Sequence, residues 1–142
     1  VNVVQVVDLA LDIFNEEFIA FEYPDQPVIA RMDRTQLIRV ITNLVKNAIQ
    51  AIPEQQADKR VKVTIRTASE NVYIAVSDNG SGTEIADRIF EPKFTTKTSG
   101  MGLGLGIIRN IIENYKGTIT FETNPGKGTT FTVCLPIINP VT

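Results

Sequence analysis

Residues 33–53 read D-R-T-Q-L-I-R-V-I-T-N-L-V-K-N-A-I-Q-A-I-P. Apolar residues recur there at three- and four-residue spacing, which is the pattern of a long amphipathic helix with one buried face. Asp33 is suited to be the N-cap, Gln36 can reach back to complete a capping box, and Pro53 ends the helix. The apolar positions are Leu37, Val40, Ile41, Leu44, Val45, Ala48, Ile49 and Ile52.

Two asparagines border this apolar face. Asn43 and Asn47 stand one helical turn apart, with Gln50 next along, so the two carboxamides project together beside the core. One reading is that they cap neighbouring loops or face water. The other is a site for a hard cation and the phosphates that it carries, because amide oxygens are ligands that Mg²⁺ accepts while keeping several waters.

Composition limits the classes of function. The chain has 142 residues, 43% apolar and 21% charged, with a net charge of −2, which is typical of one globular domain. It has no basic run that would favour nucleic acid, and no apolar stretch that could span a bilayer. Histidine is absent, which excludes Ser-His-Asp and Cys-His catalysis and histidine-ligated zinc. The one cysteine, Cys134, sits in a strand pattern and is interpreted as packing.

The remaining chain mixes helices with strands that alternate apolar and polar residues. Such alternation favours an antiparallel sheet with one covered face. We therefore predict one domain over residues 1–142, of the α+β class: a two-layer α/β sandwich with helices on one face of a mostly antiparallel sheet. The other expected helices are 3–14, 84–90 and 107–115, and the expected strands are 18–23, 28–32, 61–66, 72–76, 119–121 and 131–135.

Glycines mark a candidate anion site. Gly100, Gly102, Gly104 and Gly106 alternate along the chain before a helix, whose first N–H groups can bind phosphate. The spacing matches neither G-x-G-x-x-G nor the G-x-x-x-x-G-K-[ST] phosphate loop. A flexible hinge is the alternative reading.

A carboxylate marks a candidate base-binding site. Asp78 ends a predicted strand and is followed by Gly80 and Gly82. It is read either as part of a polar turn or as an acceptor for the exocyclic amino group of adenine, which an acceptor-only carboxylate selects over guanine. Between these sites lies F-E-P-K-F-T-T-K (residues 90–97), read either as a surface loop or as a mobile lid that brings Lys97 to the terminal phosphate.

Five motifs in chain order resemble the N, G1, F, G2 and G3 boxes of bacterial sensor histidine kinases. They read N-L-V-K-N-A, D-N-G-S-G, F-E-P-K-F-T-T-K, G-M-G-L-G-L-G and G-K-G-T-T-F, and the resemblance covers the chain from about residue 3 to residue 136. It implies the Bergerat ATP-binding fold, and the T-T-K ending of the lid is most similar to nitrogen-regulation-type and related kinases.

The resemblance also implies roles for individual residues. Asn47 would ligate Mg²⁺ with Asn43 beside it, Asp78 would hold adenine, and Thr130 would bond near adenine through a water shared with Asp78. Asn43 and Lys97 would be the catalytic residues. The full nucleotide-contacting set would be Asn43, Asn47, Gln50, Asp78, Gly80, Gly82, Phe94, Thr96, Lys97, Gly100, Met101, Gly102, Leu103, Gly104, Leu105 and Thr130.

The implied reaction is transfer of the γ-phosphoryl group of Mg·ATP to a histidine on a separate dimerisation domain, which passes the signal to a response regulator. Since this chain has no histidine, we expect that domain and the sensor regions to lie outside it. The family implies a cytoplasmic domain of a bacterial inner-membrane protein, with no direct contact with membrane or nucleic acid.

The chain departs from the family pattern at two places. Gln50 stands where a basic residue is common, and the segment from Gly82 to Ile89 is about two residues short. An anti-sigma-type serine kinase, a nucleotide-gated interaction module and a pseudokinase remain as alternatives. Asn43 occupies the place of the glutamate that activates water in gyrase-type ATPases, so we expect the isolated chain to hydrolyse ATP poorly.

Overall fold

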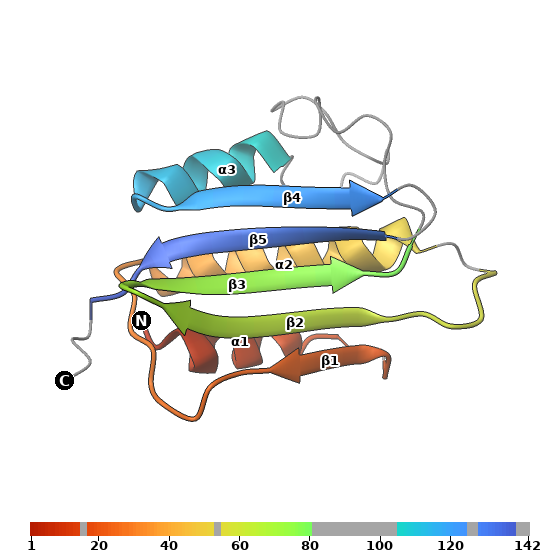
Figure 1. The fold of residues 1–142 in the computed structure, drawn as a ribbon, viewed down its shortest axis with the longest axis horizontal. Coiled ribbons are helices and arrows are strands. Elements are labelled where there is room, and N and C mark those ends of the chain that lie inside the picture. The colour runs from red at the N-terminus through yellow and green to blue at the C-terminus, as the bar shows by residue number, and fades with distance from the viewer. Residues whose placement is uncertain (15–16, 53–54, 81–104, 125–127, 139–142) are drawn as a thin grey trace.

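The computed structural model describes residues 1–14, 17–52, 55–80, 105–124 and 128–138, with only the backbone described at Leu105, Thr123 and Asn124. Five strands form one sheet in the order β1-β2-β3-β5-β4 (Figure 1). The pair β1–β2 is parallel, and the other neighbouring pairs are antiparallel. The elements are α1 (Val3–Leu11), β1 (Ile19–Glu22), α2 (Arg34–Ala51), β2 (Val61–Ala68), β3 (Asn71–Asp78), α3 (Leu105–Asn114), β4 (Thr118–Asn124) and β5 (Gly128–Pro136).

The helices cover one face of this sheet, as predicted. Figure 1 shows α2 crossing behind β3 and β5. Inward residues of the strands alternate with half-buried or exposed ones, most regularly along β3. The predicted two-layer α/β sandwich of the α+β class is therefore confirmed. Among the described residues, no helix is long and apolar enough to cross a membrane.

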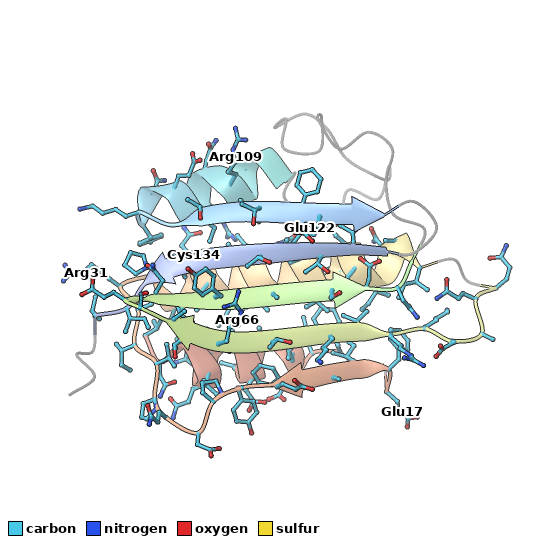
Figure 2. All side chains as sticks on the ribbon, in the orientation of Figure 1. Glu17, Arg31, Arg66, Arg109, Glu122 and Cys134 are labelled. Atoms are coloured by element: carbon cyan, nitrogen blue, oxygen red, sulfur yellow. The ribbon has the colours of Figure 1, made fainter. Side chains whose placement is uncertain are left out.

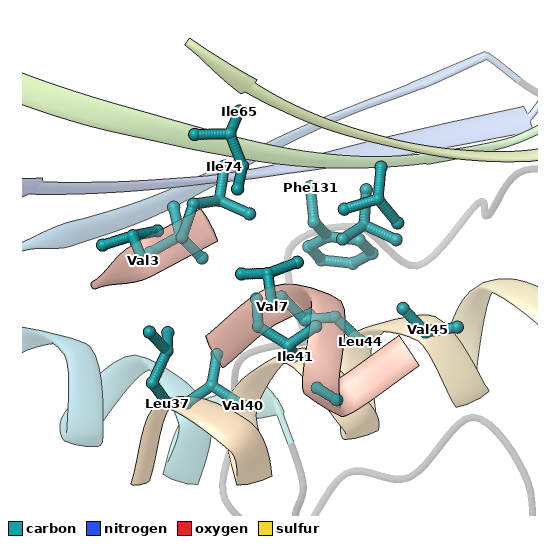
Figure 3. Packing of buried hydrophobic residues seen from close by; sticks show 14 of the residues in the cluster. Val3, Val7, Leu37, Val40, Ile41, Leu44, Val45, Ile65, Ile74 and Phe131 are labelled. Carbon is teal, nitrogen blue, oxygen red and sulfur yellow. The ribbon is translucent and has the colours of Figure 1, made fainter. Parts of the chain in front are cut away.

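The core explains why α2 is held rigidly. Six of its side chains are buried, and each fully buried aliphatic side chain stabilises a fold by about 1.5–3 kcal/mol. Detaching α2 would therefore remove free energy comparable to the whole net stability of a domain. Figure 3 shows part of this core, including Val7 of α1, Ile41 and Leu44 of α2, Ile74 of β3 and Phe131 of β5.

The opposite face of the sheet is polar and open. Arg66 and Cys134 belong to it (Figure 2), and the Arg66 guanidinium lies 4.5 Å from the ring centre of Tyr73. Cys134 is half-buried and opposite Tyr73 in the strand register, consistent with the packing role predicted for it.

One predicted strand is wrong. Residues 28–32 were expected to form a strand, but only isolated bridges occur there, at Ile29 and Ala30. The reason is that this segment lies between the two ends of the chain: Val3 N–H donates to the Val28 carbonyl, and Ile138 N–H donates to the Ile29 carbonyl. The strand expected at 18–23 occurs as β1, which pairs with β2.

The helix ends follow the prediction in part. Asp33 is the N-cap of α2 and accepts from Gln36 N–H at 3.0 Å, but the buried Oε1 of Gln36 has no hydrogen-bond partner among the described residues. The capping box is thus only half formed.

After α3, Lys116 rather than Gly117 has the left-handed backbone, with φ 64°. Gly117 is needed for space, because a Cβ there would lie closer than 3.0 Å to the Cys134 carbonyl oxygen.

Candidate functional site: the end of the sheet around Asp78

Three elements meet at one end of the sheet. The last residue of β3, the first residues of β5 and the C-terminal end of α2 lie together on the right in Figure 1. A Cβ added to Gly80 would be 2.7 Å from the Ala51 carbonyl carbon of α2. A Cβ added to Gly128, whose φ is +127°, would be 3.0 Å from Asn79 Cα. Glycine is therefore required at both positions, since only glycine permits these close backbone approaches.

Asp78 is the buried charged group of this end. Its side chain faces the helices, with 8% of the residue exposed. Oδ1 accepts a hydrogen bond from Gly80 N–H at 2.9 Å, and the backbone N–H of Thr129 also donates to the carboxylate. Burial raises the pKa of Asp78 above its ordinary value, and these two backbone hydrogen bonds oppose the rise.

This environment suits recognition of a neutral hydrogen-bond donor. The two amides hold the carboxylate in one orientation. An ionised carboxylate can accept about four hydrogen bonds, so capacity remains beyond the two amides. An exocyclic amino group is a donor that could use it.

The threonine beside Asp78 is Thr129 and not Thr130. In the strand register Asp78 is opposite Thr129, whose side chain is buried with 7% exposure on the helix side of the sheet. Thr130 is opposite Ser77, and their hydroxyl oxygens are hydrogen-bonded at 2.8 Å. Because successive side chains of a strand point to opposite faces, Thr130 points away from Asp78. The placement predicted for Thr130 is therefore wrong.

The alternation in the sequence contained the signal for Thr129. Phe131, Val133 and Leu135 are the apolar positions of the predicted strand 131–135, and all three face the core. Their alternation places residue 129 on the same face and residue 130 on the other.

The polar residues of α2 form a half-buried stripe beside its core face. Asn43, Asn47 and Gln50 are all half-buried. The Nδ2 group of Asn43 donates to the Arg39 carbonyl of its own helix at 2.7 Å. Asn47 lies one turn before Ala51, which brings its side of α2 to the end of the sheet that contains Gly80 and Asp78.

The donor set of this stripe fits Mg²⁺ better than a transition metal. It supplies neutral amide oxygens, and Mg²⁺ commonly takes few protein ligands and completes its shell with water and phosphate oxygens. Among the described residues, no group of three or more histidine, cysteine, aspartate or glutamate side chains is positioned to hold a metal. A bound Mg²⁺ would thus depend on the nucleotide phosphates for its other ligands.

Part of the predicted site lies outside the described residues. This applies to Gly82, Phe94, Thr96, Lys97, Gly100, Met101, Gly102, Leu103 and Gly104, and to the helix expected at 84–90. Leu105 begins α3, and Gly106 in its first turn is buried. In Figure 1 this N-terminal end of α3 is the end nearer the site.

Comparison with known proteins places these features in a family. The model of histidine kinase-, DNA gyrase B- and HSP90-like ATPases matches residues 32–139. Sensor histidine kinase ZraS of Escherichia coli strain K12 is 43% identical over 107 residues, which are 74% of this chain and 22% of that protein. The chain spans about a fifth of the length of the curated relatives it matches.

Solved structures of histidine kinases match the fold of this chain. The catalytic domain of histidine kinase ThkA is 32% identical and superposes with a TM-score of 0.82, covering 96% of this chain and 93% of that domain. A crystal structure of ThkA in complex with response regulator protein TrrA matches with a TM-score of 0.76 and 31% identity, covering 96% of this chain and 40% of that one. The chain therefore belongs to the histidine kinase-, DNA gyrase B- and HSP90-like ATPases and, within them, to the catalytic domains of histidine kinases.

Proposed function

We propose that this chain binds Mg·ATP at the described end of the sheet and donates the γ-phosphoryl group to a histidine on a separate dimerisation domain. The observation that carries the proposal is Asp78: a buried carboxylate, oriented by two backbone amides, at the end of the sheet that the asparagine-bearing helix α2 reaches through Ala51. Family membership supports ATP as the nucleotide.

Each described residue has a distinct part in this reaction. Asp78 accepts a hydrogen bond from the adenine amino group, with Thr129 beside it on the same face of the sheet. The amide oxygens of Asn47 and Asn43 would hold a bound Mg²⁺ ion. When bound, that ion would supply charge neutralisation on the phosphate oxygens.

The transfer needs positioning more than covalent help from the protein. A neutral imidazole nitrogen attacks the γ-phosphorus, the bond to the bridging oxygen of ADP breaks, and ADP leaves. Imidazole is largely neutral near pH 7, so the enzyme needs no strong general base. Asn43 cannot act as one, and this disfavours a water-activating ATPase cycle of the gyrase type.

The partners follow from the same proposal. We propose a response regulator as the downstream acceptor, as in the ThkA complex, and a parent kinase of the nitrogen-regulation type whose catalytic domain lies on the cytoplasmic side of a bacterial inner membrane. The T-T-K sequence at residues 95–97 motivates the subtype.

A phosphotransfer assay tests the proposal. The chain is incubated with Mg·ATP labelled at the γ-phosphate and with the histidine-bearing dimerisation domain of a related kinase, or with a serine-bearing anti-sigma-factor antagonist. We expect acid-labile label on the histidine domain only, and slow ATP hydrolysis by the chain alone. Acid-stable label on the serine protein, or fast hydrolysis without a partner, would contradict the histidine kinase assignment.

A further inference from the structure

Asn79 makes a dense set of hydrogen bonds with the loop between α2 and β2. Its Nδ2 donates to the Asp58 carbonyl at 2.7 Å, and its Oδ1 accepts from Arg60 N–H at 2.8 Å. Its backbone N–H donates to the Arg60 carbonyl at 3.2 Å. Both polar atoms of the side chain and the backbone amide are thus bonded to two residues of one loop.

Gln56 completes this arrangement from the loop side. Its Nε2 donates to the Asn79 carbonyl at 3.0 Å and to the Asp58 carbonyl at 2.8 Å. We call Gln56 and Asn79, with the backbone of residues 58–60, the turn clamp. The nearby ion pair of Asp58 and Arg60 is exposed, so it adds little to the clamp.

The turn clamp lies between the two residues that define the adenine acceptor. Asn79 separates Asp78 from Gly80, whose N–H holds Asp78 Oδ1 at 2.9 Å. Residues 55–60 contain no helix or strand, so the hydrogen bonds of the clamp connect this loop to the end of β3. Loss of the clamp would free the Asp78–Gly80 turn on the side that the sheet does not constrain.

We propose that Asn79, assisted by Gln56, is a positioning residue for the purine base: it fixes the turn that aims the Asp78 carboxylate at the six-amino group. This inference rests on the proposed function. It assigns base selectivity to the loop between α2 and β2 as well as to Asp78. A binding group displaced by more than about 0.5 Å loses much of its contribution to the binding free energy. The turn clamp therefore acts on nucleotide affinity through the position of the Asp78 carboxylate, without touching the nucleotide.

The test compares ATP with purine riboside triphosphate, which lacks the six-amino group. The ratio of the two dissociation constants measures the contribution of the Asp78 contact. In Asn79→Ala we expect ATP to bind about tenfold more weakly, the loss typical of a misplaced charged hydrogen bond, and the analogue to bind nearly as it does to wild type. In Gln56→Ala we expect a smaller loss of ATP affinity, again with the analogue binding nearly as it does to wild type.

Asn71→Ala is the matched control. Asn71 is a half-buried asparagine at the other end of β3, so its replacement removes the same group far from the site. This variant should leave the ratio unchanged. A structural role alone would weaken the binding of both nucleotides equally and leave the ratio of their dissociation constants unchanged. An unchanged ratio in both Asn79→Ala and Gln56→Ala, with or without weaker binding, overturns the inference.

The wild-type chain separates this outcome from failure of the proposed function. If wild type binds the two nucleotides equally well, Asp78 does not read the amino group, and the proposed adenine site itself is refuted. If Asn79→Ala does not fold, Gln56→Ala decides, because its two hydrogen bonds come from a surface loop.

Discussion

Gly80→Ala should weaken nucleotide binding while leaving a folded protein. The added Cβ would be 2.7 Å from the Ala51 carbonyl carbon and closer still to its oxygen, whereas ordinary contacts begin at 3.4 Å. Both atoms belong to backbone, so either the end of α2 or the turn after β3 must move by about 0.7 Å or more. Overpacking of this kind destabilises a protein by about 1–3 kcal/mol.

The expected effect on binding is separate from the effect on folding. Since α2 is held by six buried side chains, the turn should move, and it carries the amide that orients Asp78. A displacement above about 0.5 Å predicts at least a tenfold loss of ATP affinity. The assay is titration with ATP and Mg²⁺ under conditions in which urea denaturation shows each variant to be fully folded.

Gly117→Ala is the matched control for this variant. Its Cβ would meet the Cys134 carbonyl and lie 2.7 Å from Leu135 Cδ2, at the other end of β5 from Thr129. We expect a similar loss of stability with ATP affinity near that of wild type. The reasoning is refuted if Gly80→Ala binds ATP like wild type, or if both variants lose affinity to the same extent.

Three further predictions concern the same site. Asp78→Asn should be more stable than wild type at pH 7, because burial raises the folded-state pKa of Asp78 above its ordinary 3.8. The free energy of unfolding of the wild type therefore falls as pH rises from 3.8 through the raised pKa. The gain of the variant, measured by urea denaturation, should vanish below that pH range. Thr129→Val removes a hydroxyl on the same face as Asp78 in the proposed adenine site, and it should weaken ATP binding about fivefold, the cost of about one hydrogen bond. Thr130→Val, whose hydroxyl bonds to Ser77 on the other face, should change ATP affinity less than twofold. The reverse order would contradict the placement of Thr129 in the adenine site. Asn47→Asp replaces a neutral ligand with a charged one and should lower the Mg²⁺ concentration needed for half-maximal ATP binding; an unchanged midpoint would remove Asn47 from the metal site.

The local elements were predictable because their physical causes are local. The spacing of apolar residues in 33–53 requires a helix with one buried face, and α2 occurs over Arg34–Ala51 with Asp33 as its N-cap. Alternation likewise predicted β2, β3 and β5, and it indicated that Asp78 would end a strand. The carboxamide pair, the carboxylate and the glycines could thus be named as site candidates without coordinates.

Other features depend on partners distant in the chain. Residues 28–30 have a strand-like composition, but their hydrogen bonds go to the two ends of the chain, which no local pattern reveals. The turn clamp joins residues 56–60 to Asn79 across about twenty positions, and both segments look like ordinary polar loops in the sequence.

The sequence by itself determined most of the helices and strands and named the candidate groups for Mg²⁺ and adenine, since periodicity, capping and side-chain chemistry are properties of neighbouring residues. Only the tertiary structure decided which of those groups share a face and how they are held. The pairing of β3 with β5 puts Thr129 beside Asp78 and turns Thr130 to the open face. The close approach of Gly80 to Ala51 brings the end of α2 near the carboxylate. The strand pairing and this approach both depend on the register and packing of elements that are far apart along the chain.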